Sequence, residues 1–287
     1  MSKEILEKAP PNPVIDDLTP PEIAEKTVKI GINKVGLKVQ QTLALAFLAG
    51  VFISFGAMIS TIVSTNGSAL PYGINAWIKG LAFTLGLVLV LVAGGELFTG
   101  NMLIIMAFLE KKTSFSAMLR NWLLVYFGNF AGSLVMALLF ALSKQYSFGG
   151  GAVGENLLRI AEAKSGHTFM SAFILGVLGN TFVCLAVWMA YSARTTFGKI
   201  AAVILPISAF VAGGLEHSVA NMYFIPVALF VRWLNPDFVA KIGEFGGLTI
   251  ARFLLHNLIP VTIGNMIGGL FFVGFFYWFT YLKKGKV

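Results

Sequence analysis

The stretch Ala212-Gly-Gly-Leu-Glu-His-Ser-Val-Ala-Asn-Met222 places an acidic residue and an imidazole directly after an uncharged, mostly apolar segment, residues 200–215. Ionisable side chains at membrane depth are costly and usually mark a pathway or a binding site. The alternative is that Glu216 and His217 lie at the membrane interface, at the end of an ordinary hydrophobic helix. The composition and the repeats of the rest of the chain distinguish between these two interpretations.

The composition excludes an ordinary soluble domain. Of the 287 residues, 57% are hydrophobic and only 12% are charged, whereas soluble proteins carry about 25% charged residues. Long uncharged blocks recur along the chain, and a membrane-crossing helix needs roughly 20 apolar residues. The blocks are residues 39–78, 80–95, 121–143, 169–193, 200–215 and 253–282. We therefore expect an all-α, polytopic integral membrane protein.

The net charge of +8 does not indicate nucleic-acid binding, because the basic residues flank the hydrophobic spans instead of forming a patch. The single cysteine, Cys184, lies inside an apolar span, where it is expected to be a small core residue. The first residues show no secretory-signal pattern, so a retained, polar N-terminus is expected.

The chain order predicts a cytoplasmic tail with an amphipathic helix (1–38), a single six-span pore domain (39–282) and a short cytoplasmic tail (283–287). Thr19-Pro20-Pro21-Glu22 is a helix-start pattern. The helix that follows mixes apolar residues and lysines, which is typical of a helix at the membrane surface. It would be an anchor or, alternatively, a movable plug over a pore. The spans are expected at about 43–63, 78–109 with a break at 96–101, 121–143, 168–192, 200–231 with a break at 216–221, and 253–282.

The distribution of basic residues predicts the topology. Six spans place both termini on one side, which then holds 14 of the 21 Lys and Arg residues. Because such residues concentrate on the cytoplasmic side, both termini are expected to be cytoplasmic. The polar loop between spans three and four holds Lys164 and His167.

A duplication links the two breaks. Lys79, Glu96 and Asn101-Met102 recur as Lys199, Glu216 and Asn221-Met222 at a constant offset of 120, and both copies carry Ala-Gly-Gly before the break. The flanking spans also match: Ala46-Phe47-x-x-Gly50-Val51 against Ala172-Phe173-x-x-Gly176-Val177, and Gly128-Asn129-x-x-Gly132 against Gly264-Asn265-x-x-Gly268.

Two three-span halves, about 39–143 and 168–282, must run in opposite directions, so the pattern predicts an inverted 3+3 repeat with broken second and fifth helices. Paired interrupted segments indicate a binding site near the membrane midplane. Non-helical backbone at that depth is tolerated only in a protein interior or beside a cavity. A purely structural kink is the remaining alternative. The copies differ at one informative place, where Leu97 occupies the position of His217.

These residues resemble the formate–nitrite transporter family over nearly the whole chain. The resemblance is carried by Glu96-Leu-Phe-Thr99, Asn121-Trp-Leu-Leu-Val-Tyr-Phe-Gly-Asn129, Leu215-Glu-His-Ser-Val-Ala-Asn-Met222 and Asn257-Leu-Ile-Pro-Val-Thr-Ile-Gly-Asn265. It implies an aquaporin-like fold, a homopentamer, and one pore per protomer for small monovalent anions.

The resemblance also implies roles for individual residues. His217 matches the central pore histidine, with Thr99 and Asn180 as polar neighbours, and Lys164 matches a basic residue of the outer vestibule. The remaining matches are the apolar constriction residues Phe83, Leu87, Leu97, Phe98 and Phe210, and the supporting residues Glu96, Glu216, Ser218, Asn101 and Asn221. Phenylalanines at 83, 98 and 210 with leucine at 87 are most similar to the formate branch; nitrite and hydrosulfide are the alternatives.

The expected function is passage of formate across a prokaryotic inner membrane, without cofactor, metal or enzymatic activity. His217 has a reference pKa of about 6.5, so it is expected to donate a proton to formate, to stay cationic, or to act only as a hydrogen-bond donor. His167 and His256 receive no role. A membrane enzyme would need convergent ligands, which three dispersed histidines do not supply, and a sensor would not explain two paired breaks.

Overall fold

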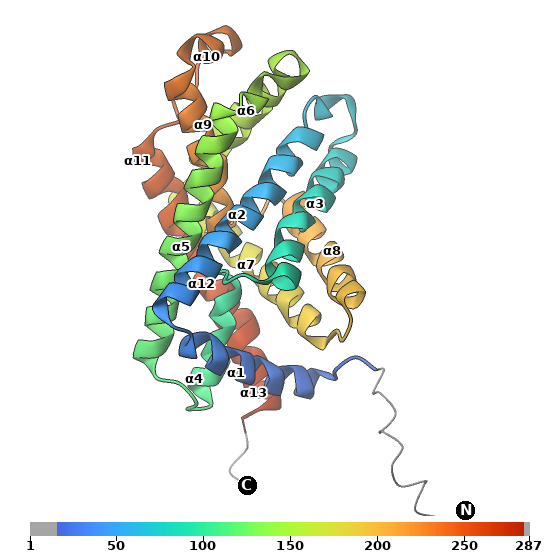
Figure 1. The fold of residues 1–287 in the computed structure, drawn as a ribbon. Helices are drawn as coiled ribbons and strands as arrows, with labels where there is room; N and C mark the ends of the chain where they lie inside the picture. The colour runs from blue at the N-terminus through green and yellow to red at the C-terminus, as the bar shows by residue number, and fades with distance from the viewer. Residues whose placement is uncertain (1–15, 284–287) are drawn as a thin grey trace, which may run out of the picture.

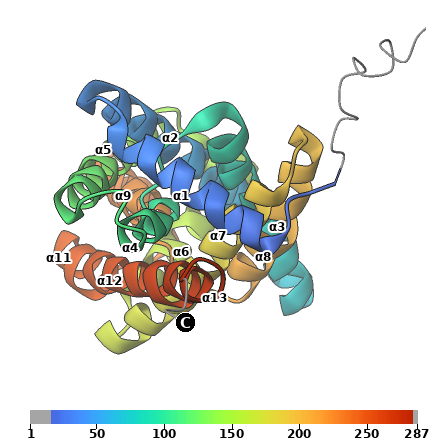
Figure 2. The same cartoon turned by 90° about the horizontal axis from the view of Figure 1, so that it is seen from below.

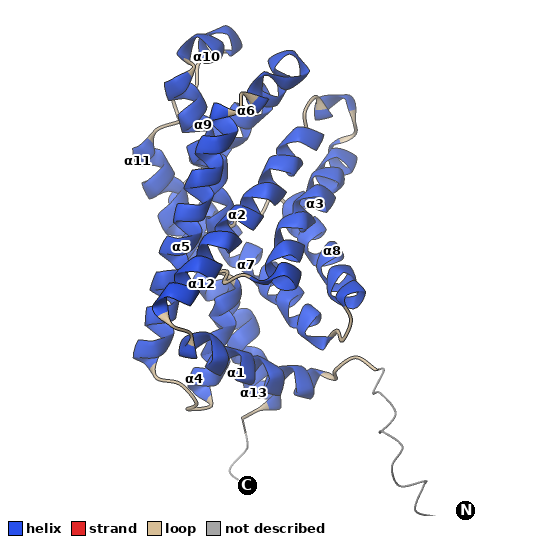
Figure 3. Cartoon of the chain, in the orientation of Figure 1, coloured by secondary structure: helices blue, strands red, loops and turns tan. Residues whose placement is uncertain are grey.

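The computed structural model describes residues 16–283, and all secondary structure in that range is helical (Figures 1 and 3). Five helices are long and apolar enough to cross a membrane: Val39–Val63, Tyr72–Gly94, Phe115–Leu142, Phe169–Ser192 and Ile250–Tyr281. The predicted fifth span consists of two shorter apolar helices in series. The predicted tails at 1–15 and 284–287 lie outside the described residues.

The first half contains three spans. They are α2 (Val39–Val63), α3 (Tyr72–Leu89) with its π-helical extension η3 (Val90–Gly94), and α5 (Phe115–Leu142). The short 3-10 turn η2 (Gly67–Ala69) precedes α3, and η4 (Gly100–Ile104) with α4 (Ile105–Leu109) continues the second span after its break.

The second half repeats this order. It contains α7 (Phe169–Ser192), the half-helices α8 (Thr196–Ala212) and α9 (Ser218–Leu234), and the short α10 (Pro236–Ile242). The last span is one interrupted helix with two π-helical stretches: α11 (Ile250–Arg252), η6 (Phe253–Leu258), α12 (Ile259–Ile267), η7 (Gly268–Phe275) and α13 (Phe276–Tyr281).

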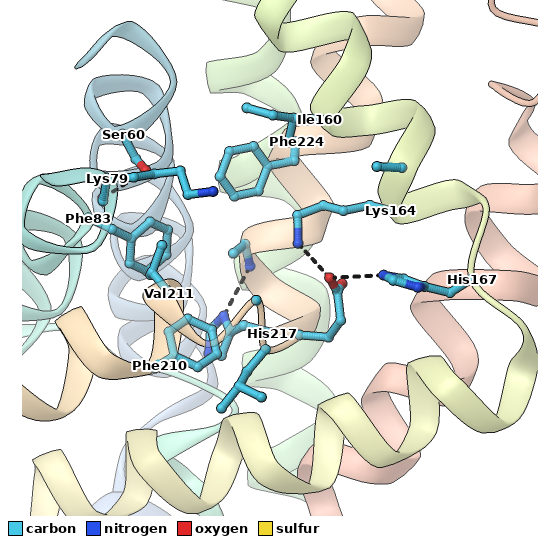
Figure 4. A pocket seen from close by; sticks show the side chains of 15 residues that line it. Ser60, Lys79, Phe83, Ile160, Lys164, His167, Phe210, Val211, His217 and Phe224 are labelled. Atoms are coloured by element: carbon cyan, nitrogen blue, oxygen red, sulfur yellow. Dashed lines mark hydrogen bonds and ion pairs between the residues drawn. The ribbon is translucent and has the colours of Figure 1, made fainter. Parts of the chain in front are cut away.

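The loop expected between spans three and four is largely helical, which corrects the prediction. After η5 (Gln145–Gly151), α6 runs from Ala152 to Ser165 and buries Val153, Leu157, Leu158 and Ala161. Their spacing is helical, so an amphipathic helix at this place was recognisable from the sequence. The α6 helix carries Lys164, whose side chain extends to the Glu216 carboxylate (Figure 4).

The amphipathic N-terminal helix begins as predicted. It is α1 (Pro20–Gly36), and the Glu22 carboxylate accepts hydrogen bonds from the backbone N–H (2.8 Å) and the hydroxyl (2.6 Å) of Thr19. These two donors lower the pKa of Glu22. In Figure 2, α1 lies across the end of the helix bundle, and its residues Ile23, Ala24 and Val28 pack with Met106 and Trp188.

The first break begins one residue earlier than predicted, and the second begins three residues earlier. Gly94 and Gly214 have positive φ values of 95° and 65°, which are accessible to glycine without strain. Gly94 is the last residue of η3, and Gly214 lies two residues after the last residue of α8. The non-helical backbone therefore falls at 95–99 and 213–217, while Ser218 and Asn221 lie inside α9. The two glycines are themselves separated by the offset of 120.

One of the predicted repeat matches is displaced by a helical turn. The N–H of Glu96 donates to the Leu45 carbonyl (3.1 Å), and that of Glu216 donates to the Leu175 carbonyl (3.2 Å). The structural offset between α2 and α7 is therefore 130, not the 126 of the sequence match. A shift of four residues keeps the same helix face, so the pattern of small residues cannot distinguish the two registers.

Glycines allow the spans of each half to pack closely. A Cβ atom at Gly132 would collide with the Phe47 carbonyl, and one at Gly268 would collide with the Val177 carbonyl. Such small-residue contacts are typical of membrane helix pairs. In Figure 1, α2 and α5 run away from α1, whereas α7 and α12 run toward it. These directions support the inverted arrangement of two halves, which stays a prediction.

Candidate functional site

A cavity of about 240 Å³ lies against the second break, on the side of the bundle that carries α6 (Figure 4). Residues of α2, α3, α6, α8 and α9 line it. They are Ser60, Lys79, Phe83, Ile160, Ala163, Lys164, His167, Phe210, Val211, Gly214, Leu215, Glu216, His217, Ala220 and Phe224. The predicted residues Phe83, Lys164, Phe210, Glu216 and His217 are therefore brought together.

Three aromatic rings form one wall of this cavity. The Phe83 ring lies 6.1 Å from Phe210 and 6.4 Å from Phe224, centroid to centroid. Phe83 and Phe210 come from α3 and α8, which belong to different halves of the chain, and both are buried. Phe210 in turn lies 6.1 Å from the imidazole of His217. His217 therefore lines the cavity beside this aromatic wall, whereas its partner Thr99 does not line the cavity.

The hydrogen bonds of His217 define its protonation. Its Nδ1 accepts the backbone N–H of Ala220 (3.1 Å), which caps α9, and its Nε2 lies 2.7 Å from the Thr99 hydroxyl. An atom that accepts an N–H bond carries no proton, so a neutral imidazole here is protonated at Nε2. The Nε2–H group then donates to Thr99 Oγ1. His217 in this arrangement is a neutral hydrogen-bond donor. A second proton on Nδ1 would require the hydrogen bond from the Ala220 N–H to Nδ1 to break.

The Glu216 carboxylate is surrounded by donors. Its Oε1 is 2.8 Å from Lys164 Nζ and 3.5 Å from His167 Nε2. Its Oε2 accepts from Asn221 (2.6 Å) and Asn257 (3.1 Å). Because all of these neighbours donate hydrogen bonds, the ionised carboxylate, which only accepts, fits this buried site.

The first break carries the same network around Glu96. Lys34 of α1 pairs with Glu96 (2.6 Å), as Lys164 of α6 pairs with Glu216. Asn101 donates to Glu96 (2.7 Å) and to Asn121 (2.9 Å), as Asn221 donates to Glu216 and Asn257. The two breaks are therefore held by duplicated ion pairs and amides.

One buried amide side chain at each break connects the break to its neighbouring helices. Asn129 accepts the Phe98 N–H (2.9 Å) and donates to the carbonyls of Ala46 and Glu96 (both 2.8 Å). Asn265 likewise accepts the Ser218 N–H (2.8 Å) and donates to the carbonyls of Gly176 (2.7 Å) and Glu216 (3.0 Å). At each break these bonds satisfy an N–H group and a carbonyl that have no helical partner.

The other predicted residues lie deeper. Asn180 donates to the Thr99 carbonyl (3.2 Å) and so connects α7 to the first break. Leu87, Leu97 and Phe98 are buried but do not line this cavity. Phe98 packs against Tyr126 at 4.9 Å and borders a different, apolar hollow between α5 and α12.

Sequence reasoning missed several residues of the site. Lys79, Phe224 and His167 line the cavity, and Lys34 pairs with Glu96. Of these residues, only Lys79 could have been identified from the sequence, because it belongs to the pattern repeated at an offset of 120. Within residues 16–283, no three His, Cys, Asp or Glu side chains are grouped in a way that could hold a metal ion.

Comparisons with known proteins identify the family. The family model described as formate/nitrite transporter matches residues 21–279. The formate channel FocA of Escherichia coli (strain K12) is 41% identical over 274 residues, covering 94% of this chain and 96% of that protein. FocA of Haemophilus influenzae is 36% identical over 272 residues, covering 93% and 95%.

Two solved structures share the fold. One is described as a pentameric formate channel with formate bound and has a TM-score of 0.78 and 39% sequence identity. The match covers 85% of this chain and 98% of the chain in that structure. The other, an FNT family ion channel, has a TM-score of 0.76 and 28% identity, and covers 90% and 98%. The chain is therefore a multi-pass membrane protein that belongs to the formate/nitrite transporter family.

Proposed function

We propose that this protein is a channel that passes formate, and that the anion travels from the cavity beside α6, between Phe83 and Phe210, to His217. The observation that carries the proposal is the position of His217. His217 lines the cavity next to Phe210, and its Nε2 lies 2.7 Å from the hydroxyl of Thr99 at the opposite break. Relatives that cover almost the whole chain are named formate channels, which supports formate over nitrite or hydrosulfide.

In this proposal His217 acts first as a neutral hydrogen-bond donor. Losing hydration in an apolar constriction costs an anion several kcal/mol, and the Nε2–H group would replace part of that hydration when it exchanges Thr99 Oγ1 for the anion. Protonation of formate by His217 would need a cationic imidazole, in which both nitrogens are donors. That state requires release of the Ala220 N–H from Nδ1, so proton delivery would be coupled to a change at the start of α9.

The assembly and orientation are part of the same proposal. A pentamer is supported by the solved relative with a TM-score of 0.78, which is described as pentameric. We place both termini in the cytoplasm of a prokaryotic cell, with the pore domain in its inner membrane, from the distribution of basic residues. The cavity then opens outward. On the α1 side, a hollow of about 10 Å³ is lined by Gly31, Lys34 and Gly100 among others; it is too small for formate, so α1 would have to move for passage through it.

Flux into proteoliposomes tests this function. Wild-type protein is expected to carry radiolabelled formate with a pH-dependent rate, and His217→Phe is expected to fold normally but lose that pH-dependent flux. His256→Phe is the matched control, because His256 is exposed. A wild-type protein that carries nitrite or hydrosulfide but not formate would correct the substrate. Unchanged flux and pH dependence in His217→Phe would remove this residue from the mechanism.

A further inference from the structure

We propose that Lys79 is an anion-capture residue of the cavity, which binds the oxygen atoms of a small monovalent anion before it reaches Phe83 and Phe210. This inference rests on the proposed function and adds a residue to it. Its starting point is the charge of the cavity wall. Three of the lining residues have side chains that are charged at neutral pH: Lys79, Lys164 and Glu216. With neutral histidines, they leave one net positive charge.

The positive charge that remains belongs to Lys79. Lys164 is neutralised by Glu216 at 2.8 Å, and it also lies over the Phe224 ring. By contrast, the ion pairs and hydrogen bonds among residues 16–283 include none made by the Lys79 ammonium group. An ammonium group that faces a cavity without a protein acceptor is available to an anion.

The backbone of Lys79 is held so that its side chain enters the cavity. Ser60 of α2 donates to the Lys79 carbonyl at 2.9 Å. On the next residue, a Cβ atom at Gly80 would collide with the backbone of Ser208 of α8, so α3 and α8 are in close contact there. In Figure 4, the Lys79 and Lys164 side chains extend into the same space from opposite sides.

The position of Lys79 along α3 suits delivery to the constriction. Phe83 follows Lys79 by four residues, and Leu87 follows Phe83 by four, so the three share one face of the helix. An anion held at Lys79 is therefore about one helical turn from the Phe83 ring. A fixed charge in a cleft with low-dielectric walls concentrates ions of the opposite sign. Lys79 would raise the local concentration of anions at the entrance.

The duplicated lysine does not occupy an equivalent position. Lys199, at the offset of 120, lies in the first turn of α8, at the end of the bundle near α1, and does not line the cavity. Capture by Lys79 would therefore favour anions arriving from the side of α6. The ligand class is a small anion with oxygen acceptors, and formate is the probe.

Initial rates of formate uptake into proteoliposomes, measured against formate concentration at low and high ionic strength, test the proposal. Lys79→Gln is expected to raise the half-saturating formate concentration about tenfold at low ionic strength. The difference should shrink at high ionic strength, because salt screens the charge. Lys79→Arg should stay close to wild type. Lys241→Gln removes an exposed lysine of α10 that does not line the cavity, and should change nothing.

Each outcome separates this inference from the proposed function. A wild-type protein that carries no formate contradicts the function itself. Wild-type flux with an unchanged half-saturating concentration in Lys79→Gln overturns only the role of Lys79. Equal impairment of Lys79→Arg and Lys79→Gln would also overturn it, because a structural role does not depend on charge. Lys79→Met is a second neutral variant, to be used if Lys79→Gln fails to assemble on size exclusion.

Discussion

Replacing Glu216 by glutamine tests how the second break is held. The carboxylate accepts from Lys164, Asn221 and Asn257, all of which donate. An amide offers one acceptor oxygen and adds two N–H donors. In Glu216→Gln at least one of the three donors therefore faces another donor, and the Lys164 ammonium loses its counter-charge.

The cost can be worked out from burial. The Glu216 side chain is 2% exposed and that of Lys164 is 18% exposed. Removing one partner of a buried ion pair typically costs about 3–5 kcal/mol. Lys164 faces a cavity and keeps some hydration, so the lower end, about 3 kcal/mol, is expected. At roughly 2–4 °C per kcal/mol, the unfolding midpoint should fall by about 6–12 °C.

The assay is thermal unfolding of the purified protein in detergent, followed by tryptophan fluorescence. The double variant Glu216→Gln/Lys164→Met removes the unpaired charge as well, so it should recover part of the loss. Glu96→Gln is the matched variant at the first break, where Lys34 is the partner. A midpoint in Glu216→Gln equal to that of the wild type would refute the argument that this ion pair holds the break.

Three further predictions concern other contacts of the same framework. Asn265→Ala leaves two buried backbone groups of the break, the Ser218 N–H and the Glu216 carbonyl, without partners, so it should destabilise the protein by about 2–6 kcal/mol; an unchanged denaturation midpoint would contradict this. Gly264→Leu should prevent close packing of α12 on α7 and reduce the yield of assembled protein, whereas Gly73→Leu, which meets open space, should not; equal yields on size exclusion would count against the packing argument. Lys34→Ala removes the ion pair between α1 and the first break, so trypsin should cleave within α1 faster than in the wild type; an equal cleavage rate would show that this pair does not hold α1.

Much of the architecture was predictable because membrane helices leave local signals. Uncharged blocks of sufficient length predicted the spans, and Gly94 and Gly214 mark where two of them break. The repeated spacing of Glu96 and Glu216 indicated that the breaks are paired. Such signals depend on composition and short-range geometry, so they can be read without knowing which helices are neighbours.

The helix α6 and the register of α2 against α7 were harder to predict. α6 is less hydrophobic than the spans and lies in a segment that looks like a polar loop. The register match failed because a displacement by one turn preserves the face of a helix and its pattern of small residues.

The order of residues along the chain is enough to place Glu216 and His217 at a break inside a membrane span, and to show that a second break accompanies it. Which side chains meet there depends on the packing of the helices. Lys34 reaches Glu96 across 62 residues, Lys164 reaches Glu216 across 52, and Thr99 reaches His217 across 118. Local spacing cannot encode such partners, because they are set by how α1, α6 and the two breaks come together. The same packing leaves Lys79 facing the cavity while its counterpart Lys199 lies outside it.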